Sequence, residues 1–246
     1  MQIIPAFVTQ NKCYQAGAPL TPRGIMLHSV GTPQPSAAVF ARSFNQYQPG
    51  GASVCVHAFA QADGTVYQTL PWEMRGWHCG GSANSTHIGV EMTEPSAGMT
   101  RSEAAEQIAG TYRTVVELFA ELCKQYELDP AQDGVIIGHA EGHRRGVASN
   151  HADPELLWRT YDMGYTMDGF RRDVAEAIKN GAREEALDMP RYDSVAEMPQ
   201  WARADAQRLI DRGALQGNTD GKLDVSEDML RTMIVCQRMV DEQKET

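Results

Sequence analysis

Side chains able to carry out chemistry are concentrated in one stretch of the chain, residues 138–158. It holds three of the seven histidines, His139, His143 and His151, together with Asp153. Imidazole and carboxylate are ligands that zinc accepts in tetrahedral geometry, and a catalytic zinc site leaves one position open for water. Two ligands from this stretch would leave a third to be supplied from elsewhere in the chain.

His28 is the candidate for that further ligand. It ends the short apolar run 25–27, and a second apolar run, 135–137, leads through Gly138 into His139. Each run predicts a short buried strand. Two such strands that both end in histidine can bring the two imidazoles to one edge of a sheet. Residues 139–158 are then expected to form a long loop, which in a compact domain is typical of a functional segment.

The elements that must position these residues follow from turn signals and periodicity. Two β-rich runs flank Asp63-Gly64, which indicates a hairpin. Apolar residues recurring every three or four positions predict a long helix that begins at Ser102 and ends at Tyr126. The other predictions are an irregular segment at 1–23, strands at 53–59, 65–70 and 88–92, and helices at 37–47 and 167–180. This order favours an α/β fold, a mixed central β-sheet with helices packed on it.

The composition of the chain changes after residue 180. Residues 1–180 carry the α/β pattern, whereas 181–190 are polar and charged and predict a linker. Residues 191–246 predict a small α-helical domain with helices at about 200–212 and 226–241. About 50 residues is near the lower limit for independent folding, so docking or self-association, as in a homodimer, would help to stabilise it.

Composition excludes several classes of protein. The formal net charge is -10, without a basic cluster, which argues against nucleic-acid binding. No apolar run approaches the 18 residues of a membrane span. The start of the chain lacks the pattern of a signal peptide, so we expect synthesis in the cytoplasm without a secretion signal. The five cysteines are odd in number and form no Cys-x-x-Cys, which indicates reduced thiols and not a disulfide framework.

Five short motifs in a fixed order give the chain a family resemblance over residues 20–160. They are Leu27-His-Ser, Asp63-Gly-Thr-Val-Tyr, Gly76-Trp-His, Asn84 with Ile88-Gly-Val-Glu, and Gly138-His followed by Asp153-Pro. The chain thereby resembles the zinc-dependent N-acetylmuramoyl-L-alanine amidases of the amidase type 2 group, relatives of the peptidoglycan-recognition proteins. The segment 141–155 is similar to endolysins and autolysins of Gram-positive bacteria and their phages. The resemblance implies a hydrolase that binds peptidoglycan, degrades the cell wall and acts in cytolysis.

The resemblance also implies roles for single residues. It places zinc ligands at His28, His139 and Asp153, and a general base at Glu91. The family often has lysine two positions before the last ligand; here that position is His151, which would face the developing oxyanion. Two departures from the family pattern are Glu155, where glycine is expected, and the 14-residue spacing between His139 and Asp153.

Further residues are candidates for substrate contact, and each has a structural alternative. The candidates are His57, Trp77, His78, Asn84 and His143. A structural role is the alternative for His57, loop packing for His78, and the wall of a groove or the core for Trp77. Glu91 has an alternative as well, an ion pair with an arginine such as Arg75.

The C-terminal segment resembles a single S-layer-homology-like repeat. The resemblance rests on Tyr192-Asp-Ser-Val, Trp201-Ala, Leu209-Ile-Asp-Arg-Gly and Asp220-Gly, and it implies binding of a secondary cell-wall polymer through 191–246. Dimerisation or packing on the first domain are the alternatives. For the whole chain, the alternatives to a zinc amidase are a non-catalytic peptidoglycan-binding module and a zinc hydrolase of small amides.

Overall fold

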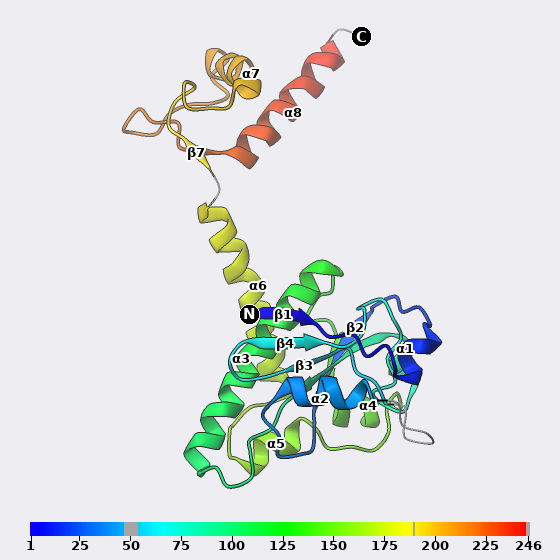
Figure 1. Cartoon of the computed structure of the whole chain (residues 1–246). Coiled ribbons are helices and arrows are strands. Elements are labelled where there is room, and N and C mark those ends of the chain that lie inside the picture. The colour runs from blue at the N-terminus through cyan, green and yellow to red at the C-terminus, as the bar shows by residue number, and fades with distance from the viewer. Residues whose placement is uncertain (47–53, 189, 245–246) are drawn as a thin grey trace. The chain divides into compact units, whose positions relative to one another are not determined.

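A six-stranded mixed sheet organises the first part of the chain (Figure 1). The computed structural model describes residues 1–46, 54–188 and 190–244, and the chain divides into two units, Met1–Asn180 and Gly181–Thr246. The strand order is β1-β4-β3-β5-β2-β6, and every pair is parallel except β3 and β4. The strands are β1 (Gln2–Pro5), β2 (Gly24–Ser29), β3 (Ala58–Ala60), β4 (Thr65–Gln68), β5 (His87–Met92) and β6 (Ile136–Gly138).

Helices cover both faces of this sheet, because successive side chains of a strand point to opposite faces. Ala58 and Ala60 of β3 join the main core, which includes Phe119 of α3 and Phe170 of α6. Phe59, between them, packs instead with Phe40 of α2. The helices of this unit are α1 (Lys12–Ala16), α2 (Ala37–Phe44), α3 (Arg101–Gln125), α4 (His139–Arg144) and α5 (Glu155–Thr160), with a 3-10 turn at Ser82–Ser85. Helix α6 (Met167–Asp188) begins in this unit and continues past its last residue, Asn180. The predicted fold class, a mixed sheet with helices packed on it, is confirmed.

The long helix α3 begins one residue earlier than the periodicity predicts. Its N-cap is Thr100: the Thr100 hydroxyl accepts from the backbone N–H of Glu103, and the Glu103 carboxylate accepts from the backbone N–H of Thr100 at 2.7 Å. This capping box satisfies two backbone donors that the first turn of a helix otherwise leaves without partners.

Thr100→Ala is expected to lower the free energy of unfolding by about 1 kcal/mol, because it removes the N-cap acceptor of α3. Ser102→Ala is the matched control, since Ser102 is an exposed residue inside the helix. Urea unfolding of both variants checks the prediction. Equal stability of the two variants would show that Thr100 does not cap the helix.

Three segments differ from the sequence-based expectations. The stretch predicted as a long loop contains α4 and α5; α4 starts where Glu141 accepts from the backbone N–H of Gly138. Residues 1–23 include β1, an edge strand that pairs with β4 and therefore tolerates Pro5 at its end. The predicted linker is helical as far as Asp188, because residues 182–187 are alanine, arginine, glutamate and leucine, all good helix formers. The hairpin predicted around Asp63-Gly64 is confirmed, since β3 and β4 pair antiparallel across it. Position 53 of the predicted strand 53–59 and position 47 of the predicted helix 37–47 lie outside the described part of the chain.

The second unit has a small core of its own. Its helices are α7 (Gln200–Asp211) and α8 (Glu227–Lys244), and β7 (Arg191–Tyr192) pairs antiparallel with β8 (Val225–Ser226). The buried apolar residues are Met198, Ala202, Ala206, Leu209, Leu215, Val225, Leu230 and Ile234. No helix of the described residues is long and apolar enough to span a bilayer.

Candidate metal centre

The candidate metal centre lies where three parallel strands end. Strand β2 runs between β5 and β6, and its register pairs His28 with Glu91 and Leu27 with Gly138. His139 follows Gly138 directly and begins α4. The carboxyl ends of neighbouring parallel strands meet at one edge of the sheet, which is a common place for a binding site in α/β proteins. His28, Glu91 and His139 are therefore brought to the same edge by the register of the sheet.

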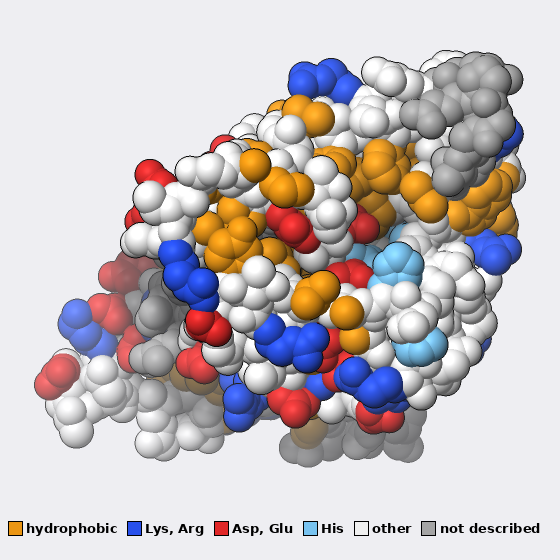
Figure 2. Space-filling view, turned by 90° about the horizontal axis from the view of Figure 1, so that it is seen from below, with side chains coloured by type: hydrophobic (Ala, Val, Ile, Leu, Met, Phe, Trp, Pro, Cys, Tyr) orange, Lys and Arg blue, Asp and Glu red, His pale blue; other side chains and the backbone are white. Residues whose placement is uncertain are grey.

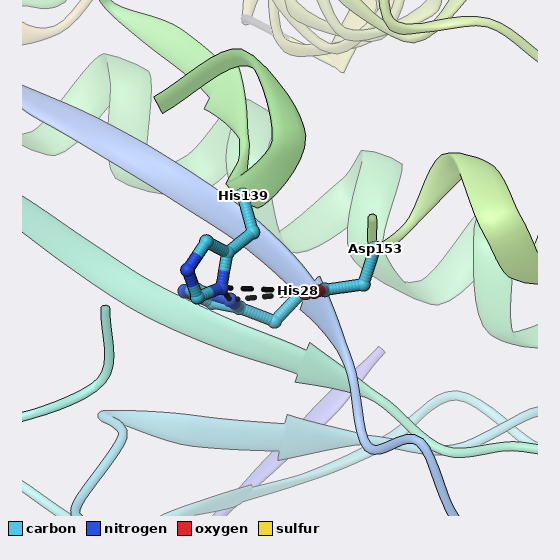
Figure 3. A group of neighbouring side chains, drawn as sticks. All are labelled: His28, His139 and Asp153. Carbon is cyan, nitrogen blue, oxygen red and sulfur yellow. Dashed lines mark hydrogen bonds and ion pairs between the residues drawn. The ribbon is translucent and has the colours of Figure 1, made fainter. Parts of the chain in front are cut away.

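Asp153 completes a group of three donors around one point (Figure 3). One ligand atom from each of His28, His139 and Asp153 lies within 4.8 Å of the other two. The two Nδ1 atoms are 3.0 Å apart, His28 Nδ1 is 3.2 Å from Asp153 Oδ2, and His139 Nδ1 is 3.6 Å from Asp153 Oδ1. Ligands about 2.0–2.1 Å from a tetrahedral zinc ion lie roughly 3.3 Å from one another. The three donors thus fit a zinc ion and leave its fourth position free.

Contacts around the triad hold His139 and Asp153 in place. Glu141, in the first turn of α4, forms an ion pair with Arg171 of α6 at 2.9 Å. His139 Nε2 lies 3.2 Å from the Ser149 hydroxyl, and the backbone N–H of Ser29 donates to Asp153 Oδ2 at 3.4 Å. The ligands therefore start from fixed positions, which reduces the reorganisation needed on metal binding.

Electrostatics at the triad favour a neutral His139 and an ionised Asp153, the protonation states that a metal requires of these two ligands. Burial and the nearby His28 lower the pKa of His139 to about 4. Burial opposes ionisation of Asp153, but its hydrogen bond with His28 and the charges of the two histidines lower its pKa below the ordinary value. Burial also works to lower the pKa of His28, yet Asp153 and the charge of Glu91 raise it. The carboxylates thus attract positive charge to the point where the ligand atoms meet.

Glu91 is a carboxylate that lines the same part of the first unit as the triad. Its Oε2 is buried and has no hydrogen-bond partner among the described residues. Burial raises the pKa of Glu91 to about 7, although the charge of His28 works in the opposite direction. Among the described residues, Arg75 Nε is likewise buried without a partner, and no ion pair between Arg75 and Glu91 is found. A carboxyl group that titrates near neutrality beside a candidate metal centre is suited to accept and return a proton.

These groups lie in a cavity of about 960 Å³ on the first unit. Figure 2 shows a hollow in this face of the molecule in which acidic and histidine side chains gather between hydrophobic ones. The cavity is lined by His28, Glu91, Glu94, His139, His151 and Asp153, and by apolar or aromatic residues that include Val54, Trp77, Leu156 and Tyr161. A cavity of this kind can take a ligand that is polar at one end and partly apolar elsewhere.

Comparison with protein families identifies the unit that carries this cavity. The family model described as N-acetylmuramoyl-L-alanine amidase matches residues 18–156. The chain belongs to this amidase family. No curated protein matches the chain.

Solved structures share the fold of this amidase family member. The catalytic domain of XlyA is 22% identical, with a TM-score of 0.53 over 71% of this chain and 99% of that one. A Staphylococcus aureus hydrolase, AmiA, in complex with its ligand is 20% identical, with a TM-score of 0.56 over 74% of this chain and 86% of that one. A mutant endolysin from Bacillus subtilis is 20% identical, with a TM-score of 0.51 over 71% and 99% of the two chains. At these identities the likeness concerns the fold.

Within the amidase unit, the structure brings together some of the residues expected to contact substrate. Trp77, His78 and Asn84 line the cavity. Asn84 is 8% exposed and its Oδ1 accepts from the backbone N–H groups of His78 and Cys79, so it shapes the loop. His151 is exposed and its ring stacks on that of His139, with centroids 4.6 Å apart.

Two residues predicted to contact substrate lie away from the amidase cavity. His57 is fully buried; its Nδ1 accepts from the backbone N–H of Gly89 and its Nε2 donates to the carbonyl of Met74 at 2.7 Å. Burial lowers its pKa to about 4, and both nitrogens serve the backbone, so its role is structural. His143 is exposed on α4 and is not among the described residues that line the cavity.

Sequence reasoning missed how the amidase family member supports its histidines. His78 Nδ1 lies 2.9 Å from His28 Nε2, and His78 Nε2 lies 3.1 Å from the carbonyl oxygen of His87. Both nitrogens of His78 are thus engaged inside the protein and not free for a substrate. Ser149 was likewise not singled out, although it contacts His139. A long-range side-chain contact of this kind has no signal in spacing or periodicity.

Proposed function

We propose that the chain hydrolyses the amide bond between N-acetylmuramic acid and L-alanine in peptidoglycan, with a zinc ion held by His28, His139 and Asp153. The observation that carries the proposal is the convergence of these three donors in a cavity that also holds Glu91, whose Oε2 has no hydrogen-bond partner among the described residues, in a chain of the amidase family. Two imidazoles and one carboxylate are a ligand set that catalytic zinc sites use.

A zinc ion held by the three ligands and the carboxyl group of Glu91 would carry out different parts of the reaction. A zinc ion at such a site lowers the pKa of its water to about 7 and polarises a carbonyl group. Glu91 accepts a proton from the attacking water and passes it to the leaving nitrogen, which must be protonated before the amide bond breaks. Its raised pKa suits both halves of this task, because the group can gain and lose the proton near neutral pH.

His151 is the proposed partner of the oxyanion. It lines the cavity beside His139 and is exposed, so that its ring can donate a hydrogen bond into the cavity. A donor aimed at the carbonyl oxygen stabilises the negative charge that develops there. Trp77 and the other apolar residues of the lining would contact the remainder of the glycopeptide.

Because the proposed substrate is peptidoglycan, we expect the protein to act at the cell wall. We propose a role in wall degradation of the endolysin or autolysin type, in line with the resemblance of residues 141–155. The function of Gly181–Thr246 stays a prediction, either binding of a secondary wall polymer or self-association.

Incubation with purified peptidoglycan tests the proposed reaction. New L-alanine amino termini are expected to appear, to disappear when a chelator removes the metal, and to return when zinc is added, because attack on the amide requires the metal-activated water. Labelling of free amino groups followed by hydrolysis and chromatography measures them.

Two outcomes contradict the proposal in different ways. Binding of peptidoglycan without new termini would identify a recognition module without catalysis. Release of termini that a chelator leaves unchanged would show that hydrolysis does not depend on a metal.

A further inference from the structure

The ring of His78 connects the candidate metal centre to the backbone of β5. Its Nδ1 faces His28 Nε2 at 2.9 Å, and its Nε2 faces the carbonyl oxygen of His87 at 3.1 Å. The backbone of His78 is fixed as well, since its N–H donates to Asn84 Oδ1 at 2.9 Å. This side chain therefore has little freedom to turn.

Two glycines make room for the His78 ring. A Cβ atom at Gly89 would lie 2.5 Å from His78 Cγ, and one at Gly76 would lie 3.0 Å from His78 Cδ2. Distances below 3.0 Å are not tolerated by real Cβ atoms, so any larger residue at position 89 would displace the imidazole. Strand β5 is thus shaped to hold this ring against the backbone beside His28.

The hydrogen bonds of His78 determine which nitrogen of His28 is free. A carbonyl oxygen only accepts, so the bond to His87 requires the proton of His78 on Nε2. The Nδ1 of a neutral His78 is then an acceptor, and it takes the proton of His28 Nε2. This arrangement leaves the Nδ1 lone pair of His28 directed at His139 Nδ1 and Asp153, the point at which the donors of the triad meet.

We propose that His78 is a positioning residue for the candidate metal centre, which it serves by accepting the Nε2–H of His28 so that His28 binds zinc through Nδ1. The inference rests on the proposed zinc site. Partners that orient a metal-binding histidine in this way commonly contribute 10-fold to 100-fold to metal affinity. The usual partner is a carboxylate, a carbonyl or water. Here the partner is the imidazole of His78, which itself donates to the His87 carbonyl.

Zinc affinity of full-length variants, measured by competition with a chromophoric chelator, tests the inference. His78→Leu keeps most of the volume but has no acceptor, and it is expected to weaken zinc binding by about 10-fold to 100-fold. His78→Asn offers an acceptor oxygen near the former Nδ1 and is expected to restore most of that affinity. His57→Gln is the matched control, because His57 is equally enclosed but bonds only to backbone groups.

A spectroscopic measurement makes the test independent of whether the variants fold. In the zinc-loaded wild-type protein, a coupling between the nitrogens of His28 Nε2 and His78 Nδ1 is expected across their hydrogen bond in nuclear magnetic resonance. Absence of that coupling overturns the inference. So does wild-type affinity in His78→Leu, an equal loss in His78→Asn, or an equal loss in His57→Gln. A wild-type protein that binds no zinc refutes the proposed function itself and is recognised before any variant is compared.

Discussion

His28→Ala is expected to abolish zinc binding and to lower hydrolysis of peptidoglycan on the order of a thousandfold or more, because the attacking water loses its activation. His28 supplies the central donor of the triad, 3.0 Å from His139 Nδ1 and 3.2 Å from Asp153. The measurements are the zinc content of the purified protein and the rate at which L-alanine amino termini appear.

His143→Ala is the matched control for this prediction. His143 belongs to the same histidine-rich stretch as His139 but is exposed and outside the cavity. The variant is expected to retain zinc and activity. Circular dichroism must show that His28→Ala keeps its secondary structure. A folded His28→Ala protein that still holds one zinc ion would rule out His28 as a ligand.

Glu91→Gln is expected to lower kcat by about 100-fold to 10,000-fold while zinc stays bound, because the amide keeps the shape of the side chain but cannot accept the proton. The pH dependence of the wild-type enzyme follows from the same group. Burial raises the pKa of Glu91 to about 7, and a bound cation would lower it from there. The rise of kcat with pH should therefore have its midpoint at or below pH 7 and be absent from the variant.

The same substitution has an opposite effect on stability. The folded-state pKa of Glu91 lies above the unfolded value, so ionisation is disfavoured in the fold, and this residue's contribution to stability falls as the pH rises through about 7. Metal-free Glu91→Gln should thus unfold at a higher temperature than metal-free wild type at pH 8, and the difference should vanish near pH 4. Thermal unfolding of both proteins at pH 8 and pH 4 measures this difference. An equal difference in unfolding temperature at the two pH values would mean that burial does not destabilise the ionised form of Glu91.

The sequence predicted much of the site because the strands that carry it are short, apolar and followed by histidine. The runs before His28 and His139 identify two parallel strands, and strands of this kind bring their ends together. Asp153 was predicted as a ligand from the ordered motifs and not from a periodic pattern. Those motifs also gave Glu91, but they could not show that its Oε2 is buried without a partner, which depends on packing around it.

Where the structure differs from the sequence-based expectations, the difference has physical causes. His57 follows an apolar run as His28 does, yet its ring turns inward and bonds to the carbonyl of Met74. The glycines around α4 favoured the prediction of a loop, whereas the start of this helix depends on Glu141 and its distant partner Arg171. Burial and long-range hydrogen bonds decide each of these cases, and neither is recorded in the spacing of residues along the chain.

A crystal structure of the zinc-loaded protein, with anomalous scattering measured at the zinc absorption edge, tests the central claim most directly. The account predicts one strong peak about 2.0–2.2 Å from the Nδ1 atoms of His28 and His139 and from a carboxylate oxygen of Asp153. It also predicts a fourth position that opens to the cavity beside Glu91. A peak bound elsewhere, or none at this point in crystals soaked with zinc, would contradict it.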